Sequence, residues 1–245
     1  MKKTALLILA LTFITAQSFK HNYTKRKKYV VVWQPSHQTD TGKDFSEAAT
    51  CNAIVEAAML LKTKPKIKEY KVWSFGKKNL HHSDSGSNTV VAHTTAIVDG
   101  KMSGYAYELR QSNKRKPDVF IAVHNNGGTK RNAVWGYIHY GDKYEQENRD
   151  LAARLINAIA SVTPLENRGV LLDSTTGRND YRCKITGKRG FYSLDENMNT
   201  AHYRVLLEIG DNAVSRELLL DPAIQKKIGE ALKLEVAAWL AEGKD

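Results

Sequence analysis

Cysteine is scarce in this sequence, and the two cysteines present exclude several kinds of site. Among 245 residues the only ones are Cys51 and Cys183. Cysteines so far apart cannot form a zinc knuckle or a CxxC redox motif, which need them close together in the sequence. A disulfide between them stays open, because pairing cannot be deduced from sequence alone. We interpret Cys51 as a small buried apolar residue of a helix.

Long hydrophobic runs are also missing, apart from one near the N-terminus. Lys2 and Lys3 precede an apolar stretch over residues 5–16, which ends in the small-residue site Ala16-Gln17-Ser18. This combination predicts a secretory signal peptide over residues 1–18. The alternative is an N-terminal membrane anchor, but the stretch is shorter than the ~20 residues that span a bilayer. We therefore expect an exported protein, periplasmic or secreted, without a membrane-spanning segment.

Acidic residues are outnumbered by basic ones. The sequence holds 26 Asp and Glu against 37 Lys and Arg, a formal net charge of +11, of which Lys2 and Lys3 leave with the leader. A basic lead-in follows over residues 19–28. Basic exported proteins often meet polyanions such as a cell wall. Nucleic acid is the other reading, but the basic residues are scattered, with no aromatic-interleaved stripe or recognisable binding module. We expect no nucleic-acid partner.

Strands alternate with helices along the rest of the chain, which predicts an α/β fold. Apolar runs favour strands at residues 29–33, 71–75, 119–123, 135–140 and 203–210, and apolar periodicity favours helices at 46–62, 101–114, 146–162 and 222–240. Near-continuous apolar strands are typical of a mostly parallel twisted sheet with helices on both faces. No internal repeat or low-complexity linker interrupts the pattern. We therefore expect one domain over residues 29–245.

Two stretches of this domain have a less regular pattern. Residues 164–199 are rich in Gly, Asp, Asn, Arg and Thr and show no clean period, so we interpret them as a surface excursion. Its basic residues either meet carboxylates of a substrate or are solvated. His139 lies in the strand at 135–140, where we expect a half-buried polar position rather than a ligand.

Four residues with useful chemistry converge on one rim of the predicted sheet. The first strand leads to His37, the strand at 119–123 leads to His124, and the last strand carries Glu208. Glu47 opens the helix after the first strand. Ligands of open α/β sheets bind beyond the carboxyl ends of the strands. The pattern therefore predicts that these residues meet at one site.

Two imidazoles and a carboxylate are a common zinc set, and a catalytic zinc keeps a fourth position for water. The bound water then has a pKa near ~7 and can attack a carbonyl. The sequence therefore predicts that His37, Glu47 and His124 hold Zn²⁺, with Glu208 as general base and later general acid.

Each of the four residues has a plainer reading when taken alone. His37 reads as a loop histidine, and Glu47 as a first-turn acid favoured by the helix dipole. His124 reads as a hydrogen-bonded core histidine. Glu208 gives the strongest single signal, because a carboxylate inside Val-Leu-Leu-Glu-Ile-Gly is costly to bury unless it is paired or working. Taken together, the four residues favour a functional site, because residues with unrelated structural roles need not all lie at the same edge of the sheet.

The order of these residues and their flanking motifs points to a family. His37, then Glu47 at a helix start, then "VFIAVHNN", then "VLLEIG" resembles the zinc-dependent N-acetylmuramoyl-L-alanine amidases of the cell-wall type over roughly residues 29–240. The resemblance implies hydrolysis of the amide that joins muramic acid to the L-alanine of the stem peptide. It implies His37, Glu47 and His124 as zinc ligands and Glu208 as the catalytic glutamate.

The chain departs from this family at two places. Gln38 follows His37 where the family usually has glycine, and Asp211 stands where phenylalanine is usual. Neither change removes a ligand, and both are expected to alter the walls of the pocket.

We therefore expect a monomeric peptidoglycan hydrolase that acts on peptidoglycan or muropeptides, with Asn126 orienting the substrate. One rival is another zinc peptidase on the same scaffold, and a second is a non-catalytic wall-binding homologue. The sequence does not indicate an activator, a preference for polymer over soluble fragments, or the type of envelope.

Overall fold

The computed structural model describes residues 28–38, 41, 44–77, 80–81, 97–98, 101–176, 181–183 and 186–243. The signal peptide predicted over residues 1–18, and the lead-in except for Lys28, lie outside these described residues.

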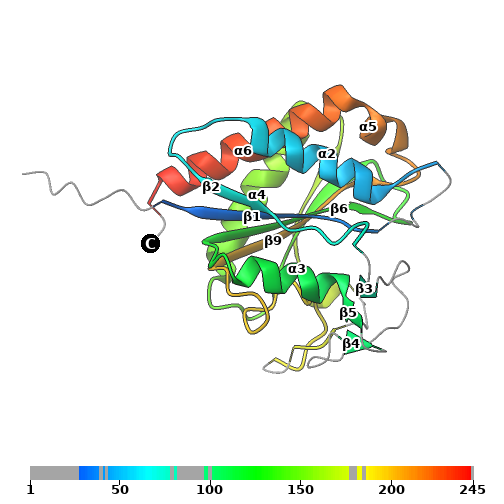
Figure 1. Cartoon of the computed structure of the whole chain (residues 1–245). Helices are drawn as coiled ribbons and strands as arrows, with labels where there is room; N and C mark the ends of the chain where they lie inside the picture. The colour runs from blue at the N-terminus through cyan, green and yellow to red at the C-terminus, as the bar shows by residue number, and fades with distance from the viewer. Residues whose placement is uncertain are drawn as a thin grey trace, which may run out of the picture.

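A six-stranded sheet forms the middle layer of the molecule (Figure 1). Its strand order is β2-β1-β6-β9-β7-β8, and neighbouring strands run parallel except for β7 and β9, which are antiparallel. The strands are β1 (Val30–Pro35), β2 (Lys68–Lys71), β6 (Val119–Asn126), β7 (Ala133–Ile138), β8 (Glu166–Leu172) and β9 (Tyr203–Asp211). A smaller sheet, in the order β3-β5-β4, contains β3 (Leu80–His81), β4 (Ile97–Val98) and β5 (Lys101–Ser103).

Helices cover both faces of the large sheet, as the sequence predicts. Three long helices pack on one face, namely α2 (Glu47–Leu60), α4 (Glu145–Val162) and α6 (Pro222–Ala241). The opposite face carries α3 (Gly104–Asn113), and Figure 1 shows the sheet between α2 and α3. Short elements η1 (Asp173–Thr175) and α5 (Arg216–Leu220) lie in the connections. The α/β fold with a mostly parallel sheet is therefore confirmed.

The two faces of the sheet divide the core because strand side chains alternate. Val31 and Trp33 of β1 belong to the larger apolar cluster, under α2, α4 and α6, whereas Val32 belongs to the smaller one, beside α3. On β9, Leu206 belongs to the smaller cluster, so Glu208 lies on the same face of that strand.

The helices at the predicted places begin and end close to the expected residues. Ser46 is the N-cap of α2, and its side chain accepts a hydrogen bond from Ala49 N–H. The strand predicted at residues 71–75 is misplaced, because β2 begins three residues earlier and ends four residues earlier, at Lys71, and the aromatic pair beyond it lies outside the sheet. Trp73 instead donates a hydrogen bond from Nε1 to Ser36 O at 2.8 Å and stacks on Phe75.

The interpretation of residues 164–199 as a surface excursion is wrong in part. Residues 166–172 form β8, which pairs with β7 at the sheet edge. Further along the chain, Tyr181, Phe191 and Leu194 are buried, and the last two belong to the smaller core cluster. The apolar residues of this segment are too irregularly spaced to show a period, yet they cover the face of the sheet beside α3.

Both cysteines are buried and free, so the structure contains no disulfide between Cys51 and Cys183. The burial of Cys51 confirms its interpretation as an apolar residue of α2. Within the residues that the structure describes, none of the helices combines the length and the apolar character that crossing a membrane requires.

Candidate active site

His124 and Glu208 lie opposite each other on the two central strands. They are paired in the register of β6 and β9, and a shift in that register follows between His124 and Asn126. Both side chains are buried, with 5% and 6% of the residue exposed. The strands continue to Asn126 and Asp211, so His124 and Glu208 lie near the carboxyl ends of their strands and not in the loops beyond them. The predicted neighbourhood of His124 and Glu208 is present in the structure.

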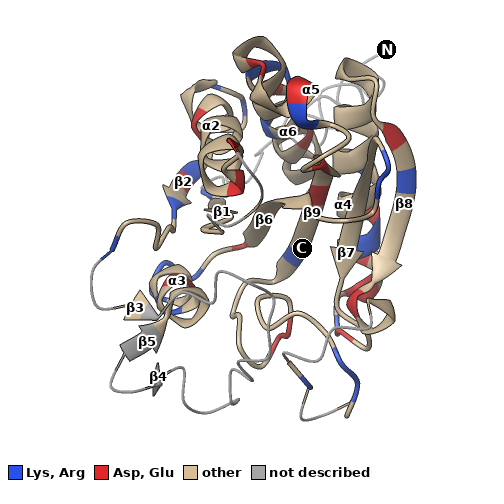
Figure 2. Ribbon diagram, turned by 90° about the vertical axis from the view of Figure 1, so that its right-hand side faces the viewer, with Lys and Arg blue, Asp and Glu red and all other residues tan. Residues whose placement is uncertain are grey.

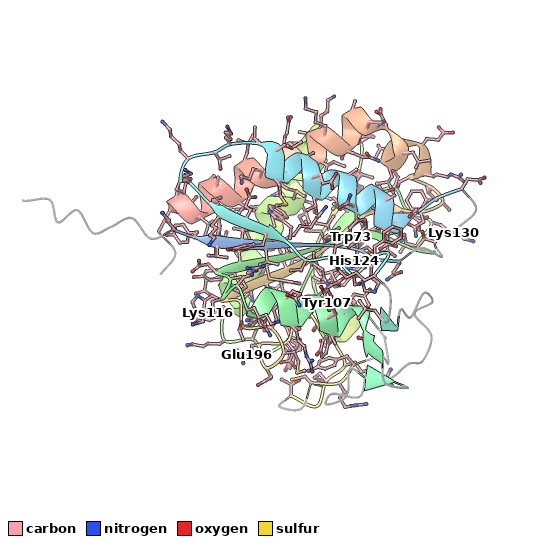
Figure 3. The ribbon with its side chains drawn as sticks, in the orientation of Figure 1. Trp73, Tyr107, Lys116, His124, Lys130 and Glu196 are labelled. Carbon is pink, nitrogen blue, oxygen red and sulfur yellow. The ribbon has the colours of Figure 1, made fainter. Side chains whose placement is uncertain are left out.

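Glu47 meets His124 at the start of α2. Oε1 of Glu47 lies 3.1 Å from Nδ1 of His124, and both side chains are almost fully buried. The N-terminal end of α2 favours a negative charge at this position, and Thr41 Oγ1 accepts a hydrogen bond from Glu47 N–H at 3.0 Å. In Figure 3 His124 lies between α2 above and α3 below. An oxygen and a nitrogen at this separation can both bind one metal ion.

His37 is held by a carboxylate that sequence reasoning missed. Its Nδ1 lies 2.9 Å from Oε1 of Glu108, a fully buried residue of α3. The same oxygen of Glu108 accepts hydrogen bonds from Ser74 N–H at 2.8 Å and Ser74 Oγ at 2.7 Å, and Oε2 accepts one from Gln34 Nε2 at 2.5 Å. Because the carboxylate engages Nδ1, Nε2 is the nitrogen through which His37 would bind a metal.

The signal for Glu108 was its helical spacing. It lies on α3 one turn before Ser112, which is also fully buried, and next to buried Leu109. A carboxylate on the buried stripe of a helix needs partners, and that argument from periodicity could have singled it out.

Cys51 is buried on α2, near the predicted site. Burial raises the pKa of the Cys51 thiol well above its ordinary value, and the negative charges of Glu47 and Glu208 raise it further. Its Sγ–H donates to Oδ1 of Asn125 at 3.5 Å. The thiol form is therefore favoured over the thiolate.

A pocket opens on the α3 side of His124 and Glu208. Its lining residues are Tyr105, His124, Phe191, Tyr192, Ser193, Leu206 and Glu208. The ring centre of Tyr105 lies 4.2 Å from that of His37 and 6.4 Å from that of His124, so this tyrosine lies beside both imidazoles of the site. Phe191 to Ser193 come from the segment after β8, which therefore forms one wall of the pocket.

The residues at which the chain departs from the family lie outside this lining. Asp211 is buried, and its carboxylate accepts hydrogen bonds from Thr129 Oγ1 at 2.8 Å, Lys130 N–H at 3.0 Å and Ala213 N–H at 2.9 Å. It joins the loop after β6 to the turn after β9. Asn126, the predicted substrate-orienting residue, lies half-buried at the end of β6, where its carbonyl accepts from Asn212 N–H.

The four predicted residues do not all touch. Glu47 and His124 are in contact, whereas His37 is directed to Glu108. In the described part of the chain, the group of three ligand-type side chains whose donor atoms all lie within 4.8 Å of one another is a different one, formed by His139, Cys183 and Asp195. His139 is 2% exposed, which corrects the expectation of a half-buried position.

The chemistry of the predicted set nevertheless suits a zinc ion. It offers two imidazoles and one carboxylate, with a further carboxylate, Glu108, behind His37 to fix its orientation. Glu208 stands next to His124 in the pocket, where a general base for a zinc-bound water belongs.

Comparison with known proteins identifies the family of the chain. A family model described as N-acetylmuramoyl-L-alanine amidase matches residues 31–238. No curated protein matches the chain significantly.

Among solved structures, the catalytic domain of CwlV from Bacillus (Paenibacillus) polymyxa var. colistinus is 17% identical, with a TM-score of 0.59 over 87% of this chain and 98% of that chain. An N-acetylmuramoyl-L-alanine amidase from Clostridium difficile 630 is 15% identical, with a TM-score of 0.60 over 89% and 99%. The CwlD amidase from Clostridioides difficile, solved with the GerS lipoprotein, is 17% identical, with a TM-score of 0.58 over 88% and 100%. At such identities these structures establish the shared fold.

Proposed function

Since this chain belongs to the N-acetylmuramoyl-L-alanine amidase family, we propose that His37, Glu47 and His124 hold the zinc ion of a peptidoglycan amidase and that Glu208 transfers the protons. The family's reaction is hydrolysis of the amide between N-acetylmuramic acid and L-alanine. The observation that carries the residue assignment is the contact of Glu47 with His124 beside Glu208, at the rim of the central strands.

The proposed reaction uses the bound zinc ion and the carboxylate of Glu208 in different roles. Bound zinc would polarise the scissile carbonyl and acidify a water molecule. Glu208 is the carboxylate of the pocket that accepts the water proton and delivers it to the departing α-amine of L-alanine. Glu208 lies on β9 between β6 and β7, and its side chain is largely buried at the pocket.

The position of His37 adds a requirement to the proposal. Ligation by all three residues needs Nε2 of His37 near the Glu47–His124 pair, while Nδ1 keeps its bond to Glu108. A histidine whose outer nitrogen donates to a carboxylate is the usual arrangement at zinc sites, because the carboxylate fixes the ring and makes it a stronger ligand.

Digestion of isolated sacculi, with mass spectrometry of the products, tests the reaction. We expect intact stem peptides that begin with free L-alanine and glycan strands without peptide, and we expect a chelator to abolish both. Products shortened from the peptide's carboxyl end would favour the rival zinc peptidase. A protein that binds sacculi but releases nothing would favour the non-catalytic homologue.

The variant Glu208→Gln tests the residue role. The amide keeps the size of the side chain but cannot accept a proton, so we expect turnover to fall about 100-fold or more with zinc content unchanged. Glu217→Gln, which removes an exposed carboxylate of α5, is the matched control. Parental turnover in Glu208→Gln would refute the role of Glu208.

We also propose that the protein is exported after removal of residues 1–18 and meets peptidoglycan as a monomer, with Asn126 contacting the substrate. The support is the charged, apolar and small-residue pattern at the N-terminus. Lys and Arg are interspersed with Asp and Glu over the ribbon in Figure 2, in keeping with a wall rather than a nucleic acid as the polyanionic partner. N-terminal sequencing of the protein from the cell envelope tests the cleavage.

A further inference from the structure

A second cluster of ligand-type side chains lies away from the proposed active site. His139 follows β7, and Cys183 and Asp195 come from the segment between β8 and β9. All three are buried, with at most 2% of each residue exposed, and one donor atom of each lies within 4.8 Å of the others. An imidazole nitrogen, a thiolate and a carboxylate oxygen are all ligands that zinc accepts.

The cluster is distinct from the rim that carries Glu208. β7 runs antiparallel to β9, with Tyr137 opposite Leu206 and Val134 opposite Ile209. The end of β7 therefore lies beside the beginning of β9, and Glu208 lies towards the other end of that strand. In Figure 3 Glu196, the neighbour of Asp195, is well separated from His124.

His139 is oriented as a metal-binding histidine. Its Nδ1 donates to Oδ2 of Asp173 at 2.6 Å, and Asp173 is fixed in turn by Tyr140 N–H at 3.1 Å and Phe191 N–H at 3.0 Å. The other nitrogen, Nε2, is buried and faces the other two members of the cluster, with Oδ2 of Asp195 at 3.8 Å. A carboxylate behind one ring nitrogen and a second ligand in front of the other is the arrangement found around bound zinc.

Gly190 leaves room for the Asp173 carboxylate that contacts His139. A Cβ atom at Gly190 would lie 2.5 Å from Oδ2 of Asp173, closer than real atoms approach. Glycine therefore lets the Cys183 segment pass directly over the carboxylate that orients His139.

The other two ligands have outer partners of their own. Thr186 N–H donates to Sγ of Cys183 at 3.5 Å. Asp195 accepts hydrogen bonds from the Tyr181 hydroxyl on Oδ2 and from Asn197 N–H on Oδ1 at 2.8 Å. Each of the three side chains is thus held in place by a group outside the cluster, as the ligands of a built metal site are.

We propose that His139, Cys183 and Asp195 bind a structural zinc ion, separate from the ion of the active site. Binding would displace one proton from an imidazolium at His139 and one from the thiol of Cys183. Exchange of two protons for one divalent cation leaves the net charge of the cluster unchanged, so the buried surroundings suit either state. Three protein ligands would leave the fourth position of a tetrahedral zinc shell to a water molecule.

The proposed zinc ion would restrict the segment between η1 and β9, which forms one wall of the active-site pocket. Apart from a single bridge between Arg182 and Arg189, the described residues between η1 and β9 form no strand. Between the two ligands that this segment supplies lie Phe191, Tyr192 and Ser193, which line the pocket with Glu208. A metal that ties such a segment to β7 restricts it most, because the enclosed chain is long and has few ladder hydrogen bonds of its own.

Cobalt substitution of the purified protein tests the proposal. Co²⁺ bound to a thiolate gives an intense sulfur-to-metal absorption in the near ultraviolet, and the proposed active site contains no thiolate ligand. We expect this band in the parent and in His124→Ala, and we expect its loss in Cys183→Ser. Cys51→Ser is the matched control and should keep the band, because Cys51 lies on α2 and is not a member of this cluster.

Zinc content gives an independent measure. The parent should carry about two zinc ions per chain, and Cys183→Ser and His124→Ala about one each. The parent spectrum does not depend on the folding of any variant, so absence of the thiolate band from the cobalt-loaded parent would overturn the proposal and leave a proton-linked polar cluster. One zinc per chain with the thiolate band would instead support the structural site while refuting the zinc ligands of the proposed active site.

Discussion

Replacement of Glu108 by glutamine isolates the effect of a single buried charge on the proposed zinc site. In the parent, Oε1 of Glu108 accepts from His37 Nδ1 and from Ser74, and Oε2 accepts from Gln34 Nε2. The glutamine can keep the first set of bonds through its amide oxygen. Its amide nitrogen would face Gln34, whose Oε1 makes no hydrogen bond to a described residue and can turn to accept.

Glu108→Gln is therefore expected to remove the negative charge behind His37 while the hydrogen bonds of this side chain are kept. Removing the outer partner of a metal-binding histidine typically weakens metal affinity or activity about 10- to 100-fold, which corresponds to roughly 1.4–2.7 kcal/mol. Glu108→Ala is a poorer test, because it would leave several buried donors unsatisfied at a cost of about 1–3 kcal/mol each.

Zinc affinity measured by competition with a chromophoric chelator provides the assay, alongside the free energy of unfolding from urea titration. Glu69→Gln is the matched control, because Glu69 is also largely buried and accepts from Trp33 Nε1 at 2.9 Å, far from the rim. We expect zinc affinity to fall in Glu108→Gln and to stay at the parental value in Glu69→Gln. Equal zinc affinity in Glu108→Gln and the parent would refute the reasoning.

Two further predictions concern stability. Gly229→Ala should lower the free energy of unfolding by about 1–3 kcal/mol in urea titration, because its Cβ would lie 2.3 Å from Ile54 O where α6 crosses α2. Gly127→Ala is the control, because its Cβ would meet only a side chain, at 3.7 Å. Its free energy of unfolding should stay within about 0.5 kcal/mol of the parent. Burial favours the neutral form of Asp211, but backbone N–H groups of its own turn and the Thr129 hydroxyl hold its pKa below the ordinary value. The folded-state pKa is lowered, so this carboxylate stabilises the fold above about pH 4 and the effect is lost as pH falls through the lowered pKa. Asp211→Asn should therefore cost about 1–3 kcal/mol at neutral pH, and the difference from the parent should shrink in acid; a difference that does not change with pH would contradict this reading.

The architecture could be predicted because each central strand contains a short run of consecutive apolar residues. These runs are residues 119–123 in β6 and 205–207 in β9, and their alternation with amphipathic helical segments indicates a mostly parallel sheet. Polar residues that interrupt such runs, His124 and Glu208, stand out for the same reason. Their partnership follows from strand adjacency, which is a property of the fold and not of local sequence.

Contacts made by irregular segments could not be predicted from sequence patterns. The bond between His37 and Glu108 joins residues 71 positions apart in the sequence, one in a loop and one on a helix. The cluster of His139, Cys183 and Asp195 depends on the path of a segment that has neither a helical nor a strand period. The chemistry of each residue was visible, but nothing local indicated which of them would meet.

The strand that carries Glu208 also holds the opposite wall of its pocket. At the beginning of β9, the buried side chain of Arg204 donates from Nε to Leu194 O at 2.9 Å and bonds to the carbonyl of Ala201. Phe191 also packs edge-on against Tyr137 of β7, with ring centres 5.4 Å apart. Glu208, the proposed catalytic base, and the pocket wall are therefore fixed to the same two strands. Loosening the wall should alter how substrate is positioned against Glu208 without altering the carboxylate itself. Loss of the second ion should for this reason raise KM before it lowers the zinc content of the active site, whereas loss of the ion at the rim should abolish turnover outright.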